Sequence, residues 1–221
     1  MMHWFRKDEA FDQLCSAKFR QSLEQVKSTR VTGEAILRAM QPSSPLEWVQ
    51  LIILFDQMPR NIYRGEESKT VFTVFDPIAQ HIAHAATAAG VHRHPLLRYR
   101  IGHRLWFNMP LMHSEDRAMH QKAVELIQSM ADDVADTANP QKDAEDGTGD
   151  QYQELVKSRA IVASSRDAAV RLCESQLQFE VRHKDIIDRF GRYPHRNGPL
   201  GRQMTADEQE FLDGGGDTFG S

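Results

Sequence analysis

Apolar side chains recur at helical spacing along most of this chain, and that spacing limits the fold more than any other feature of the sequence. Residues three or four positions apart lie on one face of an α-helix. The first such stripe consists of Phe11, Leu14, Cys15, Phe19 and Leu23. A sheet strand would need alternating apolar and polar residues, and only residues 70–75 come near that pattern. We therefore predict an all-α fold.

Local start and stop signals divide the pattern into helices. Ser44 is an N-cap residue followed by a proline at the first helical position, and Glu47 completes a capping box. We expect this helix to end at Pro59, because proline lacks the backbone N–H that a helix needs. Asp76 is again followed by proline and starts the next helix, which Gly90 ends as a C-cap.

Similar signals predict the later helices. Pro95 begins a segment that should break at Pro110, and Ser114 starts a helix with acidic residues in its first turn. A long apolar stripe resumes near Tyr152 and predicts one or two further helices. A capping box at Thr205 predicts a short helix before a run of glycines.

Residues 131–150 interrupt this helical pattern. The stretch contains seven acidic residues, one lysine, and turn-forming Asn-Pro and Gly-Thr-Gly sequences. Such a polar segment cannot bury enough apolar surface to offset its conformational entropy. We expect a mobile acidic loop at about 131–150, within a single domain that spans residues 1–221.

The composition limits the classes of function. The net charge of −4 argues against a nucleic-acid binder, which would carry a broad basic face. No apolar run approaches the roughly 18 residues of a membrane span, and the first residues lack a signal-peptide pattern. Cys15 and Cys173 fall in helical patterns and should be buried reduced thiols. We expect a cytoplasmic protein without nucleic-acid or membrane partners, and its oligomeric state stays open.

Polar side chains gather in three clusters, each beside a proline where an apolar helix begins or ends. The clusters are residues 56–65, 110–116 and 183–202. Residues 182–202 alone hold six Lys or Arg against two Asp, although the whole chain is negatively charged. We expect the three clusters to meet at a common rim and to attract an anion.

The arginine and amide side chains of these clusters are the candidates for binding a small anionic substrate, because guanidinium groups bind carboxylate and phosphate bidentately. The predicted substrate-binding residues are Arg60, Asn61, Arg64, Asp116, Arg189, Arg192, Arg196 and Asn197. In the alternative interpretation, the arginines pair inside the protein with Asp56, Asp76, Asp116 and Asp188.

The histidines and the remaining carboxylates are the candidates for proton transfer. Histidine changes charge near neutral pH, and a neighbouring carboxylate can orient its ring. The predicted catalytic residues are His113, His183, His195, Glu115 and Asp56. Alternatively, each histidine bonds a backbone carbonyl at a helix end. The sequence has no fixed metal-ligand spacing and no glycine-rich nucleotide motif, so we predict neither a metal nor another cofactor. A metal held by His113, Glu115 or Asp116 and a histidine of the third cluster is the alternative.

Several motifs resemble those of the Domain of Unknown Function 924 family. They comprise Trp4-Phe5 with Asp8, residues 11–12, residues 54–65, residues 110–116 and residues 183–202. The resemblance covers nearly the whole chain. It implies a tetratricopeptide-like all-α fold, in which antiparallel helical hairpins stack in a right-handed array with a concave face. The family is uncharacterised, so the resemblance implies no substrate.

Two functions are compatible with these observations. The first is a small-molecule enzyme of the isomerase, dehydratase (lyase) or hydrolase type, which uses general acid–base chemistry on an anionic or polyoxygenated substrate. The second is a non-catalytic tetratricopeptide-like adaptor that binds an acidic peptide or a carboxylate. An adaptor would carry its basic residues on helix faces. The position of the mixed clusters at helix ends therefore favours the enzyme.

Overall fold

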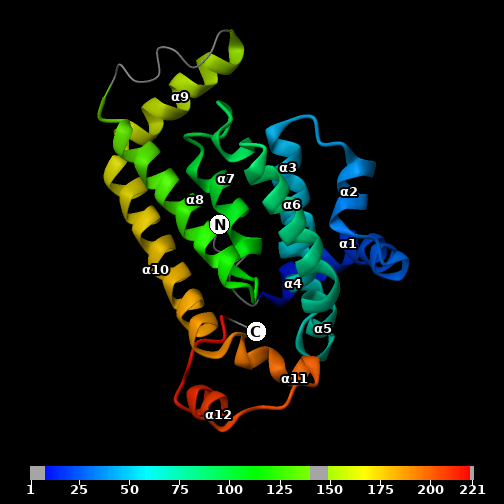
Figure 1. The fold of residues 1–221 in the computed structure, drawn as a ribbon. Coiled ribbons are helices and arrows are strands. Elements are labelled where there is room, and N and C mark those ends of the chain that lie inside the picture. The colour runs from blue at the N-terminus through cyan, green and yellow to red at the C-terminus, as the bar shows by residue number, and fades with distance from the viewer. Residues whose placement is uncertain (1–7, 140–148, 220–221) are drawn as a thin grey trace.

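The computed structural model describes residues 8–139 and 149–219, and these form helices and turns without any strand (Figure 1). The all-α prediction is therefore confirmed, whereas the tetratricopeptide-like stacking stays a prediction. The helices are α1 (Glu9–Thr29), α2 (Gly33–Met40), α3 (Pro45–Ile52), α4 (Met58–Ile62), α5 (Ser68–Thr70), α6 (Asp76–Ala88), α7 (Ile101–Met112), α8 (Arg117–Asp136), α9 (Asp150–Ser164), α10 (Arg166–Phe190), α11 (Asn197–Leu200) and α12 (Ala206–Asp213).

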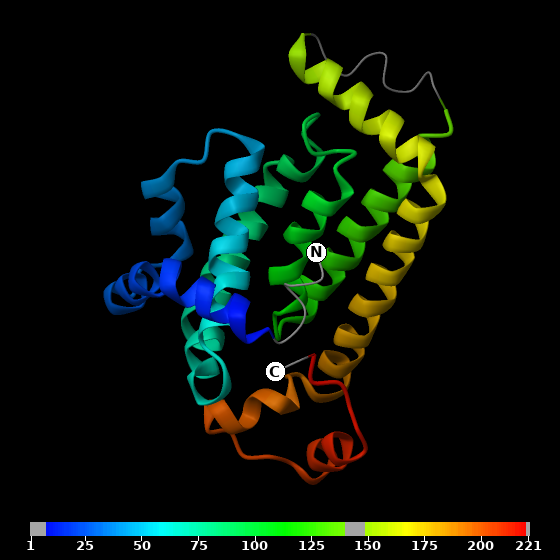
Figure 2. The same cartoon turned by 180° about the vertical axis from the view of Figure 1, so that it is seen from behind.

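Helices α3, α6, α7, α8 and α10 lie side by side in one row (Figure 1). Helices α3 and α6 pack on α7, and α8 lies between α7 and α10, while α2 contacts the other side of α6 (Figures 1 and 2). Helix α1 crosses α4. After α10 the chain turns back across one end of the row, and α11 reaches α5 (Figure 1). This brings residues 191–202 to the end of the row where α4 and the α7–α8 connection also lie.

The apolar core holds that end of the row in place. The largest cluster of buried apolar side chains joins α1, α3, α6, α7 and α8 and includes Ile52, Phe75, Ile82 and Leu111, all of them at 0% exposure. Burying a side chain of this size contributes about 1.5–3 kcal/mol. The core therefore fixes the backbone on which the polar clusters stand.

The expectation that Pro59 ends a helix is wrong, because Pro59 lies inside α4. Helix α6 does begin at Asp76, as predicted, but no side chain caps its start. A π turn at Ile53–Gln57 leads directly into α4, and a second π turn at Val71–Phe75 leads into α6. A proline ring clashes with the carbonyl four residues earlier, and in both cases that carbonyl belongs to the π turn. The wider π turn accommodates the proline, so each helix continues through it.

The predicted limits of α7 also differ from the structure. The helix begins at Ile101 rather than at Pro95, and it continues through Pro110 to Met112. Other local signals are confirmed: Ser44 and Thr205 both form capping boxes, and Gly90 adopts the left-handed conformation, with φ of 71°, after α6.

The acidic loop expected at 131–150 is helical in its first part. Helix α8 extends to Asp136, because Val134 is fully buried and Asp133 is a buried ion-pair partner rather than a solvated charge. Asp133 accepts hydrogen bonds from Arg98 at 2.9 Å and from Arg104 at 2.5 Å. Helix α9 already begins at Asp150, and residues 140–148 lie outside the described residues.

Both cysteines are free and buried, as the sequence predicts. In the part of the chain that the structure describes, none of the helices combines the length and the apolar character needed to cross a bilayer.

Candidate functional site

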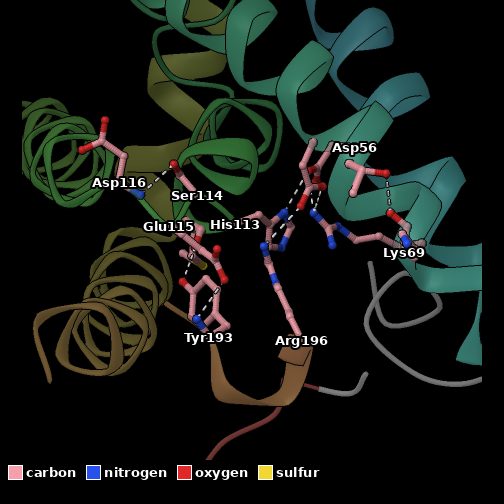
Figure 3. A network of polar contacts seen from close by, with 12 residues as sticks. Asp56, Lys69, His113, Ser114, Glu115, Asp116, Tyr193 and Arg196 are labelled. Atoms are coloured by element: carbon pink, nitrogen blue, oxygen red, sulfur yellow. Dashed lines mark hydrogen bonds and ion pairs between the residues drawn. The ribbon is translucent and has the colours of Figure 1, made fainter. Parts of the chain in front are cut away.

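A histidine and a buried carboxylate form the centre of the candidate site. His113 follows the last residue of α7, and its Nδ1 lies 2.8 Å from Oδ1 of Asp56 in the first π turn (Figure 3). Asp56 is only 1% exposed, and Gln57 donates a hydrogen bond of 2.5 Å to its second oxygen. An ionised carboxylate only accepts hydrogen bonds, so Nδ1 of His113 carries the hydrogen and Nε2 keeps a lone pair.

The surroundings set the charge state of this pair. Burial by itself would raise the pKa of Asp56, but the nearby His113 and Arg60 and two hydrogen bonds outweigh it and bring the pKa below its ordinary value. Burial also lowers the pKa of His113, and Arg60 adds to this effect. Near neutral pH the site therefore holds an ionised Asp56 that orients a neutral His113, which is the arrangement of a general base.

Arg60 connects Asp56 to a second buried carboxylate. Its Nη2 lies 3.4 Å from Asp56 and also hydrogen-bonds Asp76, which is 3% exposed and stands directly after the second π turn. Arg196 approaches the other oxygen of Asp76 at 3.4 Å. Two carboxylates and two guanidinium groups thus balance one another. For Arg60 and Arg196 the alternative interpretation, internal pairing with aspartates, describes what the structure shows.

These arginines still carry unused hydrogen-bond donors. Arg196 extends from the turn Pro194–Arg196 toward His113, and its guanidinium carbon lies 4.6 Å from the ring centre of Phe72 and 4.5 Å from that of Tyr193 (Figure 3). The Nε atoms of Arg60 and Arg196 are buried without a hydrogen-bond partner in the described structure. An unsatisfied buried donor costs about 1–3 kcal/mol, so an oxygen-bearing ligand would be stabilised here.

His183 and His195 lie together around Tyr193 at the edge of this centre. The ring centres of Tyr193 and His183 are 6.0 Å apart, and those of Tyr193 and His195 are 5.5 Å apart. His183 donates from Nδ1 to the carbonyl of Phe179 at 2.8 Å, as the alternative interpretation of the histidines describes. Burial lowers the pKa of His183 to about 2 and that of His195 to about 3, so both rings are neutral at pH 7.

Glu115 fixes the position of the segment that carries these rings. It accepts hydrogen bonds from Arg202 at 2.9 and 2.7 Å and from the backbone N–H of Tyr193 at 2.9 Å. Tyr193 also donates from its hydroxyl to the carbonyl of Met112, at 2.6 Å. Tyr193 therefore joins the returning segment, residues 191–202, directly to Met112, which precedes His113. Glu115 contributes to the site by holding this segment in place.

The remaining predicted substrate-binding residues have partners away from this centre. Asn61 donates to the carbonyl of Gln57, and Arg64 binds Asp12 of α1 at 2.6 and 2.8 Å. Asp116 is the N-cap of α8. In the C-terminal cluster, Arg189 lies over the rings of Phe190 and Phe211, while Arg192 and Asn197 both donate to Glu208.

The sequence named Asp76 only as a possible internal partner of the arginines, and it did not point to a second histidine–carboxylate pair. His120 on α8 lies 2.7 Å from Glu180 on α10, and both side chains are 0% exposed. Burial raises the pKa of Glu180. Asp76 had the signature of a helix start, and His120 stands in a helix whose polar residues look like a solvent-facing side. Local patterns therefore gave no signal for either residue.

The described residues contain no group of three His, Cys, Asp or Glu side chains placed to hold a metal ion. Two cavities lie away from His113. The larger, of about 750 Å³, is lined by residues of α1, α2 and α6 together with the second π turn. The smaller, of about 300 Å³, is lined by Arg93, Pro95, Arg98 and Leu155.

Comparisons with known proteins agree with this fold. A solved structure of a protein of unknown function from Agrobacterium tumefaciens is similar, with a TM-score of 0.59 and 26% identity, over 96% of this chain and 88% of that one. A search of curated proteins found no match. The model of the family described as "Bacterial protein of unknown function (DUF924)" matches residues 1–216. The chain that builds this histidine–carboxylate centre therefore belongs to the bacterial DUF924 family.

Proposed function

We propose that this protein is an enzyme that uses general acid–base chemistry on a small oxygen-rich substrate, with His113 as the catalytic base. The observation that carries the proposal is the 2.8 Å contact between Nδ1 of His113 and the buried Asp56. The contact fixes the tautomer, so the unprotonated Nε2 is left for a substrate. The side chain of His113 is 18% exposed, compared with 1% for Asp56, so the imidazole is the accessible member of the pair.

Arg196 and Arg60 supply the second half of the chemistry. When His113 removes a proton from a hydroxyl, a water molecule or a carbon acid, negative charge develops on the substrate. Guanidinium groups beside that charge stabilise it, and they do so more strongly in a buried site than in water. The unpartnered Nε atoms of both arginines are suited to an oxygen acceptor. Isomerisation, dehydration and hydrolysis all require only these groups.

Turnover and substitution test the proposal. The purified protein is assayed against a panel of hydroxy acids, keto sugars, lactones and phosphate esters. For any substrate found this way, His113→Asn should lower kcat at least about 100-fold, because it removes the base and general bases typically contribute that much. Asp56→Asn should also lower kcat, because an amide no longer fixes the Nδ1–H tautomer.

A chemical probe tests the base without a substrate. Diethyl pyrocarbonate modifies neutral imidazole, so His113 should react at pH 6, because burial lowers its pKa. Mapping by mass spectrometry should find His113 modified before the more buried His183. An unreactive His113 in the folded protein would contradict the proposal, as would a panel substrate that His113→Asn still turns over at the wild-type rate.

The adaptor remains a second candidate because one observation favours it. The 750 Å³ cavity beside α2 is lined by Lys27, Arg30 and His81 as well as by apolar side chains. Basic groups along an apolar groove suit an acidic peptide. A fluorescein-labelled peptide of alternating Glu and Leu should then bind the wild-type protein and lose affinity in the double variant Lys27→Glu/Arg30→Glu. His113→Asn is the matched control, since it leaves the groove intact.

A further inference from the structure

One aromatic side chain of the C-terminal segment occupies a box of rings beside the candidate site. Phe219 stacks face to face on His183, with ring centres 3.4 Å apart and planes inclined by 14°. Phe179, Tyr193 and His195 meet the Phe219 ring edge-on, at centre distances of 5.6, 6.2 and 6.5 Å. Two of these rings, His183 and His195, are among the catalytic residues that the sequence predicted.

The backbone of the segment that carries Phe219 includes two left-handed conformations. Phe219 itself has a φ of 52°, in the left-handed region that a residue with a side chain adopts only at an energetic cost. Residues 214–216 are three glycines, and Gly215 has a φ of 81°. Asp217 forms an exposed ion pair with Arg182 at 3.5 Å, which contributes little to stability. Stacking of the ring on His183 offsets the cost of this conformation. The three glycines, whose N–H groups donate to carbonyls of α12, are the most conformationally permissive residues next to the segment.

We propose that the box formed by Phe179, His183, Tyr193 and His195 is the subsite for a flat heteroaromatic ring of a ligand, and that Phe219 occupies it as an internal competitor. This proposal rests on the proposed function, because it assigns the ring of the substrate to a place beside His113. A face-to-face partner for His183 has to be planar, which excludes saturated rings.

A polar atom of the box makes a heterocycle a better occupant than the phenyl ring of Phe219. Nδ1 of His195 is buried and has no hydrogen-bond partner among the described residues. A phenyl ring cannot pair with this nitrogen. A planar ring with one N–H donor and one nitrogen acceptor can pair with it in either tautomer, while the face of the ring stays stacked on His183.

Benzimidazole is a suitable probe, because it is planar and carries both a donor and an acceptor. Its binding is measured by isothermal titration calorimetry on the full chain. Removing the competitor should make a larger fraction of the molecules competent to bind, and we expect Phe219→Ala to tighten the apparent Kd at least tenfold. Phe219→Ala/His183→Leu should lose that gain, because the stacking partner is gone. Cyclohexylmethanol, which is not planar, should bind neither variant.

Two further variants keep the test decisive. Asp217→Asn removes the exposed ion pair and leaves the box unchanged, so it should tighten binding by a smaller factor. If Phe219→Ala is poorly folded by circular dichroism, Phe219→Leu replaces it and keeps an apolar side chain in place. Benzimidazole affinity equal to wild type in a folded Phe219 variant overturns the inference, and so does a gain that survives His183→Leu.

The outcome is separable from that of the catalytic proposal. His113→Asn should abolish turnover and leave benzimidazole binding to Phe219→Ala intact, because His113 is not part of the box. Loss of ring binding with retained turnover would refute only the subsite. Ring binding without any His113-dependent turnover would refute only the catalysis.

Discussion

Arg60 stands between two carboxylates that are almost completely buried, and this determines what its removal should do. Without the guanidinium, the two buried carboxylates Asp56 and Asp76 would be left with a single cation, Arg196, which lies 3.4 Å from Asp76. We expect Arg60→Ala to lower the free energy of unfolding by about 3–5 kcal/mol, measured by urea denaturation. Arg38→Ala removes an exposed ion pair with Glu34 and is the control that should leave stability unchanged. Equal stability of the two variants would show that Arg60 is held for ligand binding alone.

Burial of neutral His183 and His195 should make the protein sensitive to acid. In the unfolded chain each ring takes up a proton below its ordinary pKa of 6.5, whereas in the folded protein burial lowers the pKa to about 2 for His183 and about 3 for His195. Between these values the unfolded state binds more protons, so stability falls as the pH decreases below 6.5. At pH 5.5 the loss should be about 1 kcal/mol for each ring.

Melting temperatures at a series of pH values from 7.5 to 4.5 check this expectation. His183→Leu removes one proton acceptor and should flatten the decline, whereas His84→Gln changes an exposed ring and should leave it as in wild type. A decline that is identical in wild type and His183→Leu would mean that His183 is not neutral in the folded protein.

The sequence identified the residue types of the site but not their partners. His113 and Asp56 were both candidates, yet they are 57 positions apart, and nothing local shows that they meet. Asp76 was read as a helix start, because an aspartate before a proline has the same local pattern whether it caps a helix or pairs inside the protein. Which arginines bind a ligand and which hold the fold together depends on packing between distant segments, and that packing leaves no short-range signal.

At the level of elements, helix ends set by local chemistry were predictable and the π turns were not. The capping boxes at Ser44 and Thr205 satisfy backbone donors within four residues, so the pattern alone reveals them. The π turn before Pro59 forms because the helix on either side is held in the core, which outweighs the tendency of proline to stop a helix. Asp56 lies in this π turn and is buried.

The capping box of α12 should control the order of the returning segment. Glu208 of this box also binds Arg192 and Asn197, so fraying of α12 loosens both. Thr205→Ala should cost about 0.5–2 kcal/mol and speed amide hydrogen exchange in α12 and in residues 191–197. Thr205→Ser is the matched control, because it retains the capping hydroxyl. Unchanged exchange at 191–197 in the alanine variant would show that the box stabilises α12 only.

At the scale of the whole molecule, the site joins two parts of the chain that fold against different neighbours. Glu115 links the α7–α8 connection to the returning segment through Arg202 and Tyr193. Glu115→Gln keeps an acceptor for Tyr193 but removes the charge that pairs with Arg202. We expect amide hydrogen exchange to become faster in residues 191–213. The exchange rates in α3, α6 and α7 should stay as in wild type. Glu125→Gln, an exposed change on α8, is the control, and equal effects of the two variants would contradict the link.

The contact between Asp76 and Arg196 spans 120 positions, and this separation has a consequence for biosynthesis. A ribosome adds about 5–20 residues per second, so Arg196 is made roughly 6–24 s after Asp76. Arg60 is already present by then and can neutralise the aspartates while the first helices pack. Arg196 beside His113, together with Tyr193 and His195, is made only after helices α1 to α10. The nascent chain can thus acquire a stable scaffold early, but its chemical centre stays incomplete until residue 196 has left the ribosome.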